Sequence, residues 1–91
     1  MPSKVLVVDD FEPIQNLYVD VLTRCQLDTI RASDGEQAMR LIYTEKPDIV
    51  LLDVDLPRMS GLEVLKRIRE HSTTKDIRII IITGNHVVER S

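Results

Sequence analysis

The sequence has 91 residues, of which 43% are hydrophobic and 30% charged, a composition typical of one ordinary globular domain. The net charge is −3 and the basic residues are scattered, which argues against a nucleic-acid-binding surface. No apolar run is long enough to span a membrane and the first residues carry no signal-peptide pattern, so we expect a cytoplasmic protein.

The chain begins with a predicted strand and helix. Residues 4–8 form a β-branched run that ends in Asp9 and Asp10, as expected for a strand buried on both faces. Pro13 then fits the first turn of a helix. Apolar residues then recur at spacings of three and four, which predicts one wide apolar helix face made of Ile14, Leu17, Tyr18, Val21, Leu22 and Cys25. Cys25 is expected to be a small buried residue on this face.

The next segment predicts a second strand and helix. Residues 27–32 are more polar and suit a strand at the edge of a sheet. Ser33 and Glu36 have the spacing of a capping box, so we expect Ser33 to begin the helix. The apolar face of that helix is predicted to consist of Ala38, Leu41 and Ile42.

A third buried strand is predicted at residues 49–52, and it ends in Asp53. Pro57 and Gly61 then turn the chain through a loop, and Ser60 is a suitable cap for the following helix. The predicted apolar face of this helix is Leu62, Leu65 and Ile68.

The last predicted strand covers residues 77–82, so the element order is β-α-β-α-β-α-β. Alternation with short connections predicts an α/β fold, a doubly wound parallel sheet with right-handed crossovers and helices on both faces. In such sheets ligands bind at the carboxyl ends of the strands, where the winding direction reverses.

Three carboxylates are candidates for a site at that edge. If the first and third strands are neighbours, Asp9, Asp10 and Asp53 converge there. Carboxylates that close repel one another and take up protons unless a cation is present. Mg²⁺ suits such a site, since it binds one or two carboxylates together with water and phosphate oxygens.

With these residues in place, the chain resembles a response-regulator receiver domain of two-component signalling, similar to the chemotaxis regulators. The motifs that carry the resemblance are Asp9-Asp10, Asp53, Leu56-Pro57, Met59-Ser60-Gly61 and Thr83-Gly84. The resemblance implies a flavodoxin-like sheet of order 2-1-3-4. It also implies that residues 1–91 form a single, incomplete receiver domain.

The resemblance also implies roles for individual residues. Asp53 would accept a phosphoryl group from a phosphohistidine on a sensor histidine kinase or a phosphotransfer protein, as a switch rather than an enzyme. Asp10 would bind Mg²⁺ directly, Asp9 through a water, and Asp53 and the backbone carbonyl of Asp55 would complete the protein ligands. Thr83 would hydrogen-bond the phosphoryl group.

One departure from the family concerns the end of the sequence. A receiver domain normally continues with a helix, a strand and a helix, and that strand ends in a lysine that pairs with the phosphoryl group. The sequence stops at Ser91, so we expect this portion to be lacking and residues 79–82 to form an exposed edge. Such an edge favours a homodimer through strand pairing or element exchange. The alternative is a longer native chain that has been trimmed.

Two other functions stay open. Asp53-Val54-Asp55 resembles the nucleophile motif of haloacid-dehalogenase-type phosphatases, which would make the protein a Mg²⁺-dependent phosphohydrolase; however, Pro57 stands where that family has Thr or Val. The chain could also be a self-associating interaction module, or an inactive fragment, that works without phosphorylation. We expect neither direct nucleic-acid binding nor a membrane partner.

Overall fold

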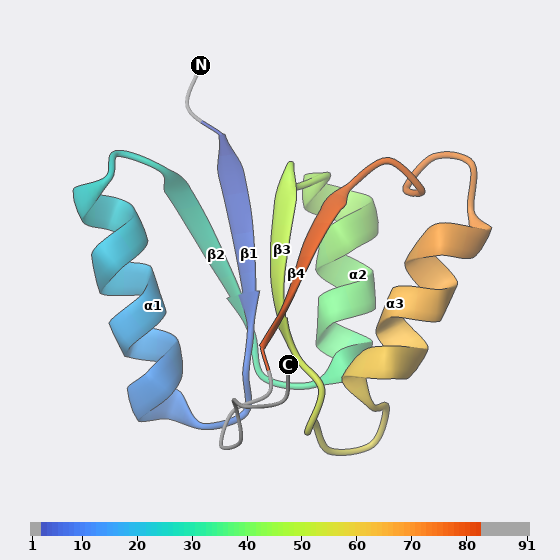
Figure 1. The fold of residues 1–91 in the computed structure, drawn as a ribbon, viewed down its shortest axis with the longest axis horizontal. Helices are drawn as coiled ribbons and strands as arrows, with labels where there is room; N and C mark the ends of the chain where they lie inside the picture. Colours follow the sequence, from blue (N-terminus) through green and yellow to red (C-terminus); the bar gives the residue numbers. More distant parts are fainter. Residues whose placement is uncertain (1–2, 83–91) are drawn as a thin grey trace.

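The computed structural model describes residues 3–82, and in them strands and helices alternate along the chain. The elements are β1 (Lys4–Val8), α1 (Glu12–Arg24), β2 (Asp28–Ala32), α2 (Gly35–Glu45), β3 (Ile49–Asp53), α3 (Gly61–Glu70) and β4 (Arg78–Ile82). Figure 1 shows all the strands pointing the same way, with their carboxyl ends at the lower side of the view. Across the described range, none of the helices has the length and hydropathy needed to cross a membrane.

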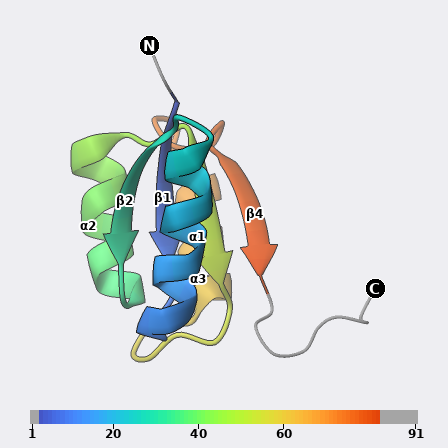
Figure 2. The ribbon, with the colours of Figure 1, turned by 90° about the vertical axis from the view of Figure 1, so that its left-hand side faces the viewer.

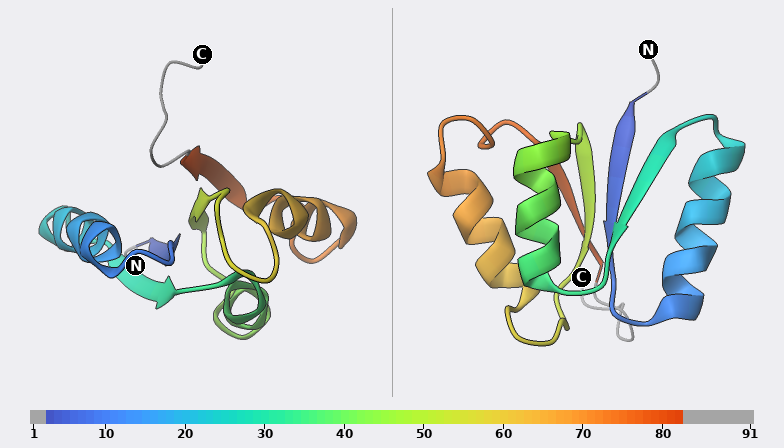
Figure 3. Two further views of the ribbon diagram at one scale, coloured as in Figure 1. Left: turned by 90° about the horizontal axis from the view of Figure 1, so that it is seen from below. Right: turned by 180° about the vertical axis from the view of Figure 1, so that it is seen from behind.

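The sheet is parallel, with the strand order β2-β1-β3-β4. The predicted flavodoxin-like order is therefore confirmed. The winding reverses between β1 and β3, and the two strands pair in register with Val8 opposite Leu52. Figures 2 and 3 show the consequence of this reversal: α1 lies on one face of the sheet, and α2 and α3 lie on the other.

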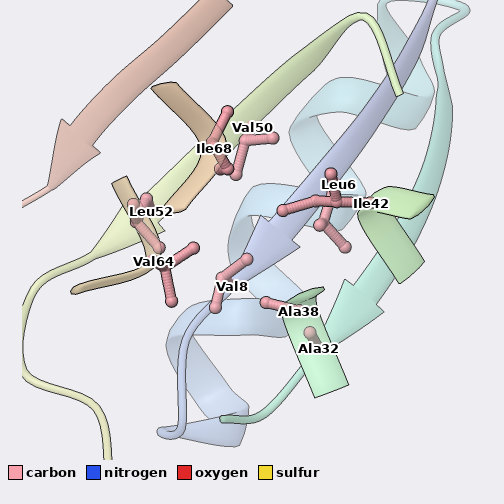
Figure 4. Close-up of a cluster of buried hydrophobic side chains, with 9 residues drawn as sticks. All are labelled: Leu6, Val8, Ala32, Ala38, Ile42, Val50, Leu52, Val64 and Ile68. Atoms are coloured by element: carbon pink, nitrogen blue, oxygen red, sulfur yellow. The ribbon is translucent and has the colours of Figure 1, made fainter. Parts of the chain in front are cut away.

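The larger part of the hydrophobic core lies between the sheet and the α2–α3 side. Figure 4 shows its members, which are all fully buried: Leu6, Val8, Ala32, Ala38, Ile42, Val50, Leu52, Val64 and Ile68. The opposite face of the sheet carries a smaller cluster of Val5, Val7 and Leu51, against which Tyr18 and Leu22 of α1 pack. Because side chains alternate along a strand, β1 and β3 supply both clusters and are buried on both faces, as predicted.

Two helices begin at side-chain caps. Ser60 caps α3 as predicted, since its hydroxyl oxygen accepts a hydrogen bond from the Glu63 N–H at 3.2 Å. The prediction that Ser33 caps α2 was wrong. Asp34 is the cap, and its carboxylate accepts from the Gln37 N–H at 2.8 Å. A carboxylate at that position also interacts favourably with the positive end of the helix dipole.

Cys25 was predicted to be buried and is exposed. The reason is that α1 ends at Arg24, and the chain then turns through Gln26, whose φ is 66°. Cys25 therefore does not continue the helix face. Leu17 and Val21 are also about half exposed, so the buried stripe of α1 is narrower than the sequence suggested.

Leu62 was predicted to lie on the apolar face of α3, but 61% of its surface is exposed. Gly61, Val64 and Ile68 are the buried residues of α3, and the partly buried Leu65 packs against the same core, as predicted. At 3.6 residues per turn, Leu62 lies about 120° around the helix from Ile68 and so points away from the sheet.

The two edges of the sheet differ in polarity. β2 forms one edge, as predicted from its polar sequence. β4 forms the other edge within residues 3–82, and there the side chains of Ile80 and Ile81 are 52% and 39% exposed. The hydrophobic edge expected at residues 79–82 is thus present in the described structure.

Candidate functional site

The acidic cluster lies at the carboxyl ends of β1 and β3. Val8 and Leu52 are paired, so the residues that follow, Asp9 and Asp53, come to the same edge of the sheet. One carboxylate oxygen from each of Asp9, Asp10 and Asp53 lies within 4.8 Å of the others. The structure thus brings together the three carboxylates that the sequence analysis singled out.

Asp53 is the last residue of β3, and only 5% of its surface is exposed. Its Oδ1 accepts a hydrogen bond from the backbone N–H of Asp55 at 3.0 Å. Burial raises the pKa of Asp53 from 3.8 to about 6, although the Asp55 N–H works in the opposite direction. The negative charges of Asp9, Asp55 and Asp10 contribute to the same rise in the pKa. Asp53 is thus a carboxylate held where its charge is unfavourable.

Asp9 is just as buried, at 4% exposure, whereas Asp10 is exposed. Oδ1 of Asp9 accepts from the backbone N–H of Phe11 at 2.9 Å, which closes the turn between β1 and α1. Burial is the main cause that raises the pKa of Asp9, and the charge of Asp10 adds to it. The pair therefore offers one fixed, buried carboxylate and one that reaches into solvent.

This donor set fits a hard divalent cation. All three groups are carboxylates, and the oxygens are close enough together to share one ion. Carboxylate oxygens are the protein ligands that Mg²⁺ prefers, with water filling the remaining positions. Burial and, to a smaller extent, charge repulsion raise the pKa values of Asp9 and Asp53, and a bound cation would stabilise the ionised form of both groups.

The loop after Asp53 is held against the end of β3 by Gly61. The N–H of Gly61 donates to the carbonyl of Val54 at 3.1 Å. A Cβ at this position would lie 2.3 Å from the carbonyl oxygen of Asp53 and 2.6 Å from the Cα of Val54. Only glycine allows this close approach, which brings the start of α3 against the backbone of Asp53.

A second contact fixes the tip of the same loop. Arg58 has a φ of 67°, in the left-handed region, and its guanidinium forms an ion pair with Asp34 at 2.8 Å. Asp34 also caps α2, and a Cβ on the adjacent Gly35 would lie 2.6 Å from the Cβ of Met59. The loop that follows Asp53 is therefore packed against the start of α2.

The carboxylates open into a cleft of about 580 Å³. It is lined by Asp9, Asp10, Phe11, Ile14, Tyr18, Asp53, Asp55 and Ile82. Its acidic end is the carboxylate cluster, and its apolar wall comes from α1 and the end of β4. The cleft thus gives solutes access to Asp53, which is otherwise buried.

Two predicted site residues need separate comment. Asp55 lines the cleft with its side chain exposed, and its N–H contacts Asp53, but it is not one of the three clustered carboxylates. Thr83 lies outside the described residues. The sequence analysis also missed Gln15, a buried amide beside the cluster, because its polar neighbours in the sequence give no sign that it is buried.

Comparison with known proteins gives a consistent result. The family model for the response regulator receiver domain matches residues 5–90. The alkaline phosphatase synthesis transcriptional regulatory protein PhoP of Bacillus subtilis is 50% identical over 70 residues, which cover 77% of this chain and 29% of PhoP. Sporulation initiation phosphotransferase F, also of Bacillus subtilis, is 40% identical over 84 residues, which cover 92% of this chain and 66% of that protein.

Solved structures are similar as well. The N-terminal domain of a response regulator receiver protein from Methanoculleus marisnigri superposes with a TM-score of 0.88 at 34% identity, covering 94% of this chain and 70% of that one. The receiver domain of the sensor histidine kinase PA1611 from Pseudomonas aeruginosa gives 0.87 at 26% identity, covering 93% and 70%, and holds a magnesium ion in its active-site cleft. On the matched sequence and the observed fold, the chain belongs to the response regulator receiver domain family.

Proposed function

We propose that this chain is a phospho-accepting switch in which Asp53 takes a phosphoryl group from a sensor histidine kinase or a phosphotransfer protein. The single observation that carries the proposal is the cluster itself. One carboxylate oxygen of Asp53 lies within 4.8 Å of an oxygen of Asp9 and of Asp10, at the carboxyl ends of two adjacent strands. We place the encounter with the phosphodonor in the cytoplasm. Membership of the family supports both statements.

In the proposed reaction an oxygen of the Asp53 carboxylate attacks phosphorus, and the phosphorus–nitrogen bond of the phosphohistidine breaks. The histidine nitrogen keeps the electron pair and takes a proton, and an aspartyl phosphate is formed. Asp53 suits this role because its Oδ1 accepts a hydrogen bond from the backbone N–H of Asp55, which fixes the carboxylate. With a pKa of about 6, Asp53 is also mostly ionised at neutral pH.

We propose that Mg²⁺ is required, and that Asp10, Asp9 and Asp53 hold it, with the carbonyl of Asp55 as a further ligand. The support is the all-carboxylate donor set and its mutual proximity. When bound, the ion would neutralise charge on the phosphoryl oxygens. Thr83 is proposed to hydrogen-bond the phosphoryl group, a role taken from the family pattern alone.

The test is the intact mass of the chain after incubation with Mg²⁺ and acetyl phosphate, a small phosphodonor. We expect one phosphoryl adduct on the wild type, none on Asp53→Asn and none when EDTA replaces Mg²⁺. An adduct that persists in Asp53→Asn, or no adduct on a folded wild type, would refute the proposal. Turnover of a generic phosphomonoester would instead favour the phosphohydrolase alternative.

We further propose that the chain self-associates through the edge of β4. Within residues 3–82 this strand has a hydrogen-bonded neighbour on one side only, and Ile80 and Ile81 on it are 52% and 39% exposed. Light scattering over a range of concentrations should show a dimer for the wild type and a monomer for Ile80→Lys. Leu62→Lys is the matched control, because Leu62 is an apolar residue on α3 with a similar exposed fraction. A wild type that stays monomeric at high concentration contradicts this second proposal.

A further inference from the structure

Gln15 is a polar side chain buried beside the acidic cluster. It lies in the first turns of α1 and is the most buried residue of that helix, with 5% of its surface exposed. Most residues that face the core from the helices are apolar. A buried amide needs hydrogen-bond partners, and its partners show what it holds in place.

Both contacts of the Gln15 amide go to backbone carbonyls at the carboxyl ends of strands. Nε2 donates to the carbonyl oxygen of Asp9 at 2.9 Å and to that of Ala32 at 3.0 Å. A side-chain amide nitrogen carries two hydrogens, so it can make both bonds at once. The carbonyl of Ala32 also accepts from the N–H of Asp9 at 3.1 Å. Gln15 therefore joins α1 to the ends of β1 and β2.

The contact with Asp9 reaches the acidic pair directly. The carbonyl of Asp9 belongs to the planar peptide group that links Asp9 to Asp10. A hydrogen bond to this carbonyl therefore fixes the orientation of the peptide plane, and with it the backbone position of Asp10. Within residues 3–82 the Asp10 side chain makes no hydrogen bond, and its position therefore depends on this backbone. The Asp9 side chain is fixed by the N–H of Phe11 in the same turn.

We propose that Gln15 is a positioning residue, which acts through the Asp9–Asp10 peptide to hold the two carboxylates ready for a divalent cation. This inference rests on the proposed function, because it concerns the same site. A glutamine suits the role for a definite reason. Two carbonyl oxygens face it, and it offers two N–H donors, whereas an apolar side chain offers none and an ionised glutamate only acceptors.

The experiment is a calorimetric titration of the folded chain with MgCl₂, comparing the wild type with Gln15→Met. Methionine has nearly the same length and volume but donates no hydrogen bond. We expect the Kd for Mg²⁺ to rise by about 10-fold, the lower end of the effect seen when groups that orient metal ligands are removed. Gln15→Asn keeps the amide but draws it back by one methylene, and an intermediate Kd is expected for it.

Thr74→Val is the matched control. Thr74 is also buried, and its hydroxyl donates to the backbone carbonyl of Ile68 at 2.8 Å, but it lies in the connection between α3 and β4, near the amino end of β4. Its replacement removes a comparable buried hydrogen bond far from the carboxylates. A merely structural role of Gln15 predicts that both variants lose stability while the Kd of the folded protein stays the same.

The outcomes separate the inference from the proposed function. A Kd raised in Gln15→Met and unchanged in Thr74→Val supports the positioning role. A wild type that binds Mg²⁺ and loses affinity in Asp53→Asn, but keeps it within about two-fold in Gln15→Met and Gln15→Asn, overturns the inference alone. A folded wild type that binds no Mg²⁺ overturns the proposed function, and the positioning role with it.

Discussion

β1 and β3 lie side by side, and at the carboxyl end of each strand a buried apolar residue is followed directly by a buried carboxylate. Val8 and Leu52 are fully buried in the hydrophobic core, whereas the next residues, Asp9 and Asp53, are carboxylates that are almost as buried, at 4% and 5% exposure. Burial stabilises the first pair by roughly 1.5–3 kcal/mol per side chain. It disfavours the charge of the second pair, as their raised pKa values show.

The comparison explains how a small protein holds an unfavourable cluster of charges. The strands are fixed by apolar packing on both faces, and the carboxylates are carried along at the strand ends. The free energy gained by apolar packing therefore offsets the unfavourable free energy of holding Asp9, Asp10 and Asp53 close together.

The largest effect is expected from Ile68→Ala, which opens a cavity in the core beneath β3. Ile68 is fully buried, so the substitution should lower the free energy of unfolding by about 2–5 kcal/mol in urea denaturation. Leu62→Ala on the same helix is the control, because a side chain that is 61% exposed should change stability by less than about 0.5 kcal/mol. Equal losses in the two variants would contradict the assigned packing of α3.

Gly61→Ala should disturb the link between the core and the acidic edge. The added Cβ would lie 2.3 Å from the carbonyl oxygen of Asp53, so the loop or the strand end must move. Overpacking of this kind costs about 1–3 kcal/mol, and the displaced carboxylate should also bind Mg²⁺ more weakly. Urea denaturation and a Mg²⁺ titration measure the two effects. A variant with wild-type stability and affinity would show that the close approach is unimportant.

An effect on stability no larger than that of Gly61→Ala is expected from the charge of Asp53 in protein kept free of metal by EDTA. The pKa of Asp53 is raised to about 6 in the folded state, above the value near 3.8 in the unfolded chain. The folded state thus binds more protons between these values, and stability falls as the pH rises through this window. The loss is complete above pH 6 and amounts to at most about 3 kcal/mol.

Asp53→Asn provides the control for this pH dependence. The variant should lack this part of the decline and should be more stable than the metal-free wild type at neutral pH, because it carries no buried charge at this position. Asp9, Asp10 and Asp55 are present in both proteins, so the difference between the two curves reports the charge of Asp53 together with its repulsion by these neighbours. Parallel curves would show that the Asp53 charge costs no stability.

Much of this arrangement could be predicted from the sequence, because it follows from local rules. The β-branched runs that end in Asp9 and Asp53 identified both central strands, and alternation of elements predicted the parallel sheet. Strand order 2-1-3-4 followed from the family resemblance, and it brings the two strand ends together.

The details that depend on three-dimensional packing could not be predicted. Periodicity does not show where a helix ends, so Cys25 was taken for a core residue although α1 stops at Arg24. Ser33 and Asp34 are both good caps, and only the local geometry selects Asp34. Gln15 was missed because its partners are backbone carbonyls of β1 and β2, which no sequence pattern reveals.

The most direct test of the central claim is the free energy of unfolding at neutral pH with and without Mg²⁺. If the carboxylates form a cation site that the core holds in an unfavourable state, Mg²⁺ should stabilise the wild type in proportion to RT ln(1 + [Mg²⁺]/Kd). The gain should be clearly smaller for Asp53→Asn, which has lost one of the clustered carboxylates. A wild type whose free energy of unfolding is unchanged by Mg²⁺, or rises no more than that of Asp53→Asn, would contradict the account.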